Sequence, residues 1–197
     1  ARFTLSEYYR ESGEDSKRRF WLNKLIEADA QAGSERSARS RYLAAMAASV
    51  FADDVFYVFK RIQLTLPLKD SIQKKRDAMQ AVIQANQKII EYKVAEFTTK
   101  AGYRLADAYA SLAQALYDSE RPEGLDALAL EQYDILLEEQ AYPFEEQAIA
   151  IHESNAQRSW QGLYDEWVAQ SFAALARLMP AQYNKQEQRT EIDYAEF

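Results

Sequence analysis

The stretch that decides the fold reads LAAMAASVFADDVFYVF and covers residues 43–59. It is apolar on nearly every side when wound as a helix, and Asp53 and Asp54 are its only charged residues. Such a helix is either surrounded by other helices of its own chain or paired with another chain. The stretch therefore predicts a central helix within residues 34–64, with homodimerisation through residues 42–59 as the alternative.

The rest of the chain also has the composition of helices. Only 5 Gly and 4 Pro occur among 197 residues, and the segments between them are rich in Ala, Leu, Glu, Gln, Lys and Arg, which favour helix. No segment alternates with period two, so strands are not expected. Helices are predicted over 15–31, 34–64, 70–98, 103–117, 126–140, 143–157 and 162–179, with Ser16 and Ser34 as cap candidates for the first two. The fold class is all-α: antiparallel helix pairs in a bundle or a superhelix.

The charge is distributed unevenly along the chain. The net charge is −7, but residues 1–104 carry 19 basic and 13 acidic residues, whereas residues 105–197 carry 5 basic and 18 acidic ones. No Lys or Arg lies between Arg121 and Arg158. This asymmetry suggests a charged partner, such as a basic segment of another protein, or contact between the two halves of the chain. A merely solvated acidic surface is the alternative. An overall pI near 4.9 argues against nucleic acid.

Known catalytic patterns are missing from the sequence. There is no Cys, which excludes disulfides and thiolate chemistry. His152 is the only histidine, and we expect it on the surface or at the edge of the core. No nucleotide-binding fingerprint is present, and the usual di-iron pattern, Glu-x-x-His on two helices, is excluded. The pairs Glu138/Glu139 and Glu145/Glu146 would hold a hard cation only loosely. We expect no enzyme and no cofactor or metal; a carboxylate- or metal-dependent enzyme is the third alternative.

Aromatic residues give the remaining candidate sites. Trp160, Tyr164 and Trp167 are spaced four and three residues apart, which would place them on one helical face at and just before the start of the predicted last helix. They either pack this helix onto its neighbours or anchor a partner. Phe56, Tyr57 and Phe59 pose the same choice, with homodimerisation as the functional option. The candidate partner-binding residues are Glu131, Asp134, Glu138, Trp160, Tyr164 and Trp167.

Part of the chain resembles tetratricopeptide (TPR) repeats. Tyr103, Ala106, Leu112 and Ala113, followed by Ala129, Tyr133, Leu136 and Pro143, loosely match one helix pair. Residues 144–180 resemble a second. The resemblance implies a right-handed superhelix that binds a partner segment in a groove between helix pairs. We divide the chain into an N-terminal long-helix part (1–101), TPR-like helix pairs (102–180) and a C-terminal tail (181–197), and expect them to form one compact domain.

A second resemblance covers residues 92–185. The segments LEQYDILLEEQAYPFEEQAI (130–149), IHESNA (151–156), YDEWV (164–168) and LMPAQY (178–183) are similar to the C-terminal part of large TPR proteins of the Gram-negative envelope. Those proteins are associated with gliding motility or with TonB/ExbB/ExbD-like systems. The resemblance implies a non-catalytic scaffold in the periplasm or cell envelope, and a fragment of a longer protein with no membrane span of its own.

Overall fold

The computed structural model describes residues 1–185. In this range the chain forms eight α-helices and no β-strand, which confirms the all-α prediction. The helices are α1 (Arg2–Glu11), α2 (Asp15–Gln31), α3 (Ala38–Arg61), α4 (Leu68–Glu91), α5 (Ala95–Tyr117), α6 (Ala127–Ala156), α7 (Glu166–Leu178) and α8 (Pro180–Tyr183). Two short 3₁₀ turns, η1 (Gly33–Glu35) and η2 (Gln157–Gln161), lie in the connections.

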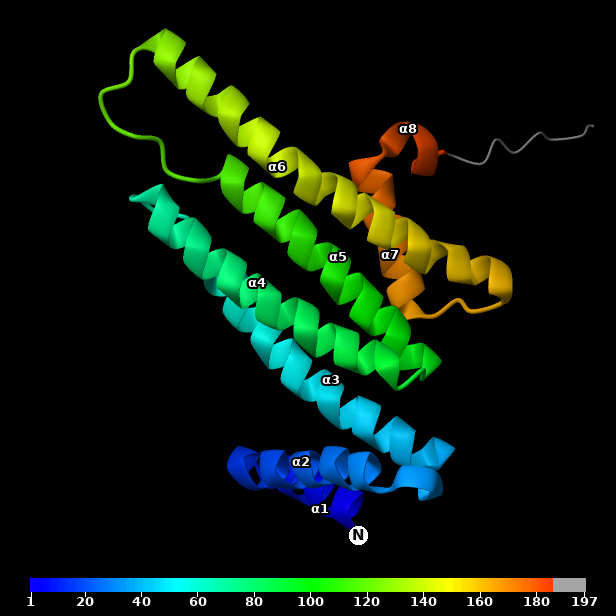
Figure 1. Cartoon of the computed structure of the whole chain (residues 1–197). Helices are drawn as coiled ribbons and strands as arrows, with labels where there is room; N and C mark the ends of the chain where they lie inside the picture. The colour runs from blue at the N-terminus through cyan, green and yellow to red at the C-terminus, as the bar shows by residue number, and fades with distance from the viewer. Residues whose placement is uncertain (186–197) are drawn as a thin grey trace, which may run out of the picture.

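Successive long helices run antiparallel and stack side by side (Figure 1). Helix α3 contacts α5, and α5 contacts α7, whereas α4 and α6 scarcely touch one another among the described helices. The helices α3, α5 and α7 thus form an inner row, with α4 and α6 outside it. The N-terminal pair, α1 and α2, lies at the end of the stack opposite α6 and α7, where α2 packs on α3.

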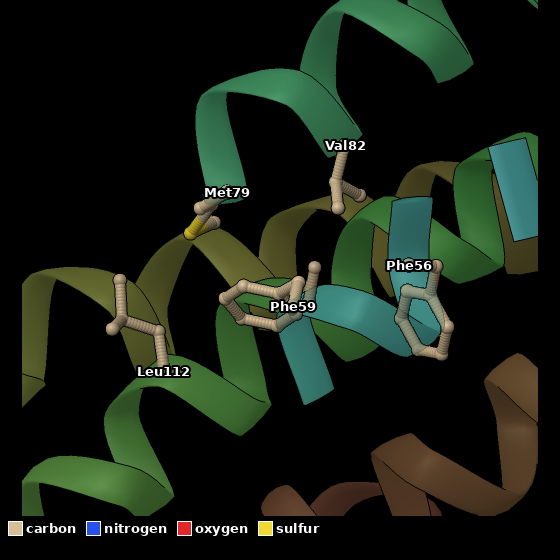
Figure 2. Close-up of a cluster of buried hydrophobic side chains, with 6 residues drawn as sticks. Phe56, Phe59, Met79, Val82 and Leu112 are labelled. Carbon is tan, nitrogen blue, oxygen red and sulfur yellow. The ribbon is translucent and has the colours of Figure 1, made fainter. Parts of the chain in front are cut away.

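The central core lies where α3, α4 and α5 meet. Phe56 and Phe59 of α3 pack against Met79 and Val82 of α4 and Leu112 of α5 (Figure 2). Within α3, Ala44, Ala45 and Ala47 are also buried, and Ala47 packs against α2. Three helices of the same chain, α2, α4 and α5, thus pack against the apolar surface of α3.

This packing buries part of the face of α3 that was proposed for homodimerisation, and the homodimer stays a prediction. Of the aromatic trio proposed for homodimerisation, Phe56 and Phe59 are buried, and Tyr57 is exposed beside Val58. Helix α3 is also the one described helix that is long and apolar enough to cross a membrane. It contacts α2, α4 and α5, and 39% of its apolar window is buried.

The two acids in α3 join it to its neighbours. Asp53 accepts from Lys100 Nζ at 2.6 Å and from Arg104 Nε at 3.1 Å, both on α5. Asp54 accepts from Arg19 Nη2 of α2 at 2.6 Å. The charges that interrupt the apolar run thus pair with bases on the adjacent helices.

Several helix boundaries correct the sequence prediction. Helix α2 spans the predicted residues, but Glu14, not Ser16, is its N-cap residue. Helix α3 begins after Ser37, whose hydroxyl accepts from the backbone N–H of Ser40, so Ser34 is not the cap. Helix α1 was not predicted.

The sequence leaves open whether Thr98–Gly102 ends the helix or only bends it, and the structure has no helix end there. Helix α4 ends at Glu91 and α5 begins at Ala95, with Lys93 in the left-handed region (φ 55°). Gly102 lies inside α5, where a Cβ atom would stand 3.2 Å from Asn155 Oδ1 of α6. This glycine allows α6 to approach, and the division at residues 101 and 102 falls within a continuous helix.

The predicted joint at Pro143 is wrong. Pro143 lies within α6, which packs against α5 on both sides of it through Ala141 and Ala148. The missing hydrogen bond and the steric cost of an interior proline are offset by this continuous packing. The boundary between the units 103–143 and 144–180 therefore falls inside α6. Together α5 and α6 span residues 95–156, which is much longer than a 34-residue repeat.

Candidate functional site

The N-terminal half of α6 has one face on α5 and another in solvent. Leu137 and Ala141 are buried on the α5 side. Asp126 caps the helix by accepting from the backbone N–H of Ala129 at 2.8 Å. Helix α7 lies beside the C-terminal half only (Figure 1), where Asn155 Nδ2 donates to Ser171 Oγ at 2.9 Å. The first turns of α6 thus extend beyond α7.

Large apolar side chains occupy the solvent side of this half. Leu128, Ile135 and Tyr142 are exposed by 64%, 48% and 57%, and Leu136 by 57%. The first three are seven residues apart, so they lie almost in line along the helix. We use the name "outer face of α6" for the surface made by four apolar residues, Leu128, Ile135, Leu136 and Tyr142, and four acidic residues, Glu131, Glu138, Glu139 and Glu146.

Acidic side chains border the apolar line on both sides. At 3.6 residues per turn, Glu131 and Glu138 fall on one side of it and Glu139 and Glu146 on the other. All four are exposed. Tyr142 Oη donates to Glu146 Oε1 at 2.7 Å, and this bond raises the pKa of the tyrosine hydroxyl. The surface therefore combines exposed apolar groups with negative charge.

The structure separates the three predicted acids. Glu131 and Glu138 lie on the outer face, as exposed side chains. Asp134 is half-buried and accepts from Arg121 Nε at 2.7 Å. Its charge is compensated within the chain, so Asp134 does not belong to this surface.

The three predicted aromatic anchors do not share a helix face. Trp160 lies in η2 and is 84% exposed, and Tyr164 lies in the connection before α7, with its ring 6.2 Å from that of Phe172. Trp167 is half-buried in the first turn of α7, where its ring is 5.6 Å from that of Tyr103. A turn at Gly162, with φ of 81°, separates Trp160 from Tyr164 and Trp167. The one-face prediction is wrong because the last helix starts later than expected.

His152 is buried, which corrects its predicted place at the surface or the edge of the core. It is 2% exposed, and its ring centroid lies 5.6 Å from that of Tyr103. Burial lowers the pKa of the imidazole from 6.5 to about 4. Its Nδ1 atom is buried with no hydrogen-bond partner among the described residues. The ring borders a cavity of about 300 Å³ between α5, α6 and α7.

A second cavity, of about 470 Å³, lies beside the end of α3. Lys75 of α4 borders it; this residue is buried and donates to the carbonyls of Phe59 and Ile62 at 3.3 and 2.6 Å. Burial lowers the pKa of this ammonium group. Lys75 therefore satisfies carbonyls at the C-terminal end of α3, as cations at helix ends do.

The sequence contains no pattern that predicts the burial of His152 or Lys75. A single histidine and a lysine among many give no motif, and only the packing shows that both are buried. Among residues 1–185, no group of three or more His, Asp or Glu side chains is placed to hold a metal ion.

Comparisons of the chain with protein-family models, with curated proteins and with solved structures give no significant match. The TPR-like and envelope resemblances, and the location that they imply, therefore stay predictions.

Proposed function

We propose that this chain is a non-catalytic helical scaffold that binds a basic amphipathic segment of another protein on the outer face of α6. The observation that carries the proposal is the apolar line Leu128, Ile135 and Tyr142 within an acidic border. Single exposed apolar residues are ordinary on protein surfaces, but large ones that recur along one helix face beside polar residues are the pattern expected of an interaction site.

The chemistry of the surface defines the partner. An apolar line on a helix fits a second helix whose apolar residues recur every three or four positions. The bordering acids Glu131, Glu138, Glu139 and Glu146 favour Lys and Arg on the flanks of that helix. Exposed ion pairs each contribute only about 0–1 kcal/mol. We therefore expect apolar burial to supply most of the affinity, and charge to select the partner and accelerate association.

The predicted groove between helix pairs is a weaker candidate for the same function. The two cavities beside α5 share Ser111 and Gln114, so they adjoin one another along this helix. Both signs of charge line each of them, including Lys60 and Glu120 in one and Glu145 and Arg177 in the other. They offer no uniform charge to a basic segment, whereas the outer face of α6 does.

A designed basic amphipathic peptide, with leucines at helical spacing and lysines on both flanks, tests the proposal by fluorescence anisotropy. We expect Ile135→Lys to weaken its binding at least about tenfold, or 1.4 kcal/mol. The matched control is Phe20→Lys, which changes a similarly exposed apolar residue on α2. Equal weakening by both variants, or by neither, would contradict the outer face of α6 as the docking surface.

A further inference from the structure

A small cavity lies where α6, α7 and α8 meet the turn η2. Its volume is about 190 Å³, which corresponds to roughly six water molecules at about 30 Å³ each. The described residues that line it are Glu153 and Ala156 of α6, Gln157 and Trp160 of η2, Phe172 of α7, and Gln182 and Tyr183 of α8. The cavity therefore has room for a compact group of a few non-hydrogen atoms.

Three aromatic side chains stand around this cavity. The rings of Phe172 and Tyr183 are inclined at 57° with their centroids 6.5 Å apart, and Tyr164 packs on Phe172 at 6.2 Å. Trp160 lines the cavity from η2 and is 84% exposed, so packing within the described chain does not account for it. The faces of aromatic rings carry partial negative charge and attract cations.

The only charged residue that the described part of the chain contributes to the lining is an acid, Glu153. Its Oε1 accepts from Tyr183 Oη at 3.0 Å. A neutral hydroxyl leaves the charge of the carboxylate in place. No Lys or Arg among the described residues forms an ion pair with Glu153. The cavity thus combines aromatic walls with one uncompensated negative charge, which is the environment of a cation.

The walls favour a cation without N–H groups. A lysine ammonium group is strongly hydrated and has three donors, and a donor that loses water without gaining an acceptor costs free energy. Aromatic rings are only weak acceptors for such donors. A quaternary ammonium group has no N–H, and aromatic cages are the usual site for it. It needs only the charge of Glu153, so the bond from Tyr183 can stay in place.

We propose that this cavity binds a trimethylammonium group of the kind found in choline, with the cation among the rings of Trp160, Phe172 and Tyr183 and near the Glu153 carboxylate. Free choline and a phosphocholine headgroup both carry this group. The site lies C-terminal to the outer face of α6, whose last residue is Glu146, so it stands or falls separately from the proposed docking function.

Trp160 itself provides the first test. The chain contains three tryptophans, Trp21, Trp160 and Trp167, and the indole N–H signal of Trp160 is identified by its loss in Trp160→Phe. Choline chloride and, separately, glycerophosphocholine are titrated into the ¹⁵N-labelled chain up to about 10 mM, ten times a Kd of 1 mM, against equal NaCl. We expect a saturable shift of the Trp160 signal, with Trp21 of α2 unchanged. The tighter of the two ligands shows which source the site fits, and no shift with either overturns the proposal.

Analogues of choline test the role of its charge and of its methyl groups. In 3,3-dimethyl-1-butanol a carbon replaces the ammonium nitrogen, and ethanolamine keeps the charge but has N–H groups in place of the methyls. Each is expected to bind at least about tenfold more weakly than choline. Equal binding of choline and its carbon analogue would show a merely apolar site and overturn the proposal.

The carboxylate is tested by Glu153→Gln, whose amide oxygen still accepts from Tyr183. We expect this variant to bind choline about threefold more weakly or less tightly still, and 3,3-dimethyl-1-butanol as before. The matched control is Glu131→Gln, which changes the net charge equally at an exposed position of the same helix. An unchanged thermal midpoint is expected for both variants. Equal effects of the two on choline binding would contradict the assignment of Glu153 to the site.

Discussion

Lowering the pH from 7 to 5 is predicted to destabilise the protein through His152. Burial holds the pKa of this imidazole at about 4 in the folded chain, against 6.5 as its ordinary value. Between these values the unfolded chain binds a proton that the folded chain does not, so the stability that is complete above pH 6.5 falls as the pH decreases. The loss attributable to His152 is about 2 kcal/mol at pH 5, and it levels off near about 3 kcal/mol below pH 4.

Urea unfolding at pH 7.5, 6, 5 and 4.5 measures this loss when the chain is compared with its His152→Gln variant. The charged or titratable groups that face the ring are Tyr103 and Asp107 of α5, Glu145 of α6 and Arg177 of α7. All of them remain in the variant, so their own titration largely cancels in the comparison. We expect the free energy of unfolding of the variant to depend less steeply on pH.

Parallel curves for the two proteins between pH 6.5 and 4.5 would refute this reasoning. They would mean that the imidazole titrates alike in the folded and unfolded chains, and hence that His152 is accessible to solvent. A His152 pKa near 6.5, measured from its ring signals in the folded protein, would contradict it independently.

Two further substitutions test the packing between helices. Gly102→Val adds a side chain whose Cβ lies 3.2 Å from Asn155 Oδ1. Overpacking of this kind should lower the free energy of unfolding, measured in urea, by about 1–3 kcal/mol. An unchanged urea midpoint would show that α6 does not approach α5 at this position. Arg36→Met removes the guanidinium that donates to the buried Asp29 carboxylate at 2.6 Å. The loss should be about 1–3 kcal/mol in thermal or urea unfolding, and Arg39→Met at an exposed position should have little effect; equal effects of the two would contradict a specific role for the pair.

The helical class and the central helix were predictable because they depend on the apolar pattern. Residues 43–59 are apolar on nearly every side, and the structure packs α2, α4 and α5 against them. The pattern of α2 likewise gave its bounds, Asp15–Gln31. It did not show which of Asp53 and Asp54 pairs with which base, since Lys100, Arg104 and Arg19 are distant in sequence.

Helix ends were predicted less well because tertiary packing overrides local signals. Pro143 and Gly102 both mark breaks by local rules, yet each lies inside a helix that packs along a neighbour. Conversely, the chain does break at Lys93, which is neither glycine nor proline. A lysine in the left-handed region has no recognisable sequence signal, so this boundary could not be predicted.

The candidate surface was predicted in part. The absence of Lys and Arg between Arg121 and Arg158 located the acidic region, and Glu131 and Glu138 do lie exposed on it. The apolar line of the outer face was missed, because only the structure shows which side of α6 lies on α5. The same holds for the cavity beside His152, whose lining comes from three helices.

The most direct test of the docking surface is a change of its charge preference. Kd is measured for the basic amphipathic peptide, and for its counterpart with glutamates in place of lysines, with the chain and with its Glu131→Lys/Glu138→Lys variant. We predict that the unaltered chain binds the basic peptide more tightly than the acidic one, and that added salt weakens this preference. The variant should bind the acidic peptide more tightly than the unaltered chain does. An unaltered preference in the variant would contradict the assignment of the outer face of α6 as the binding surface.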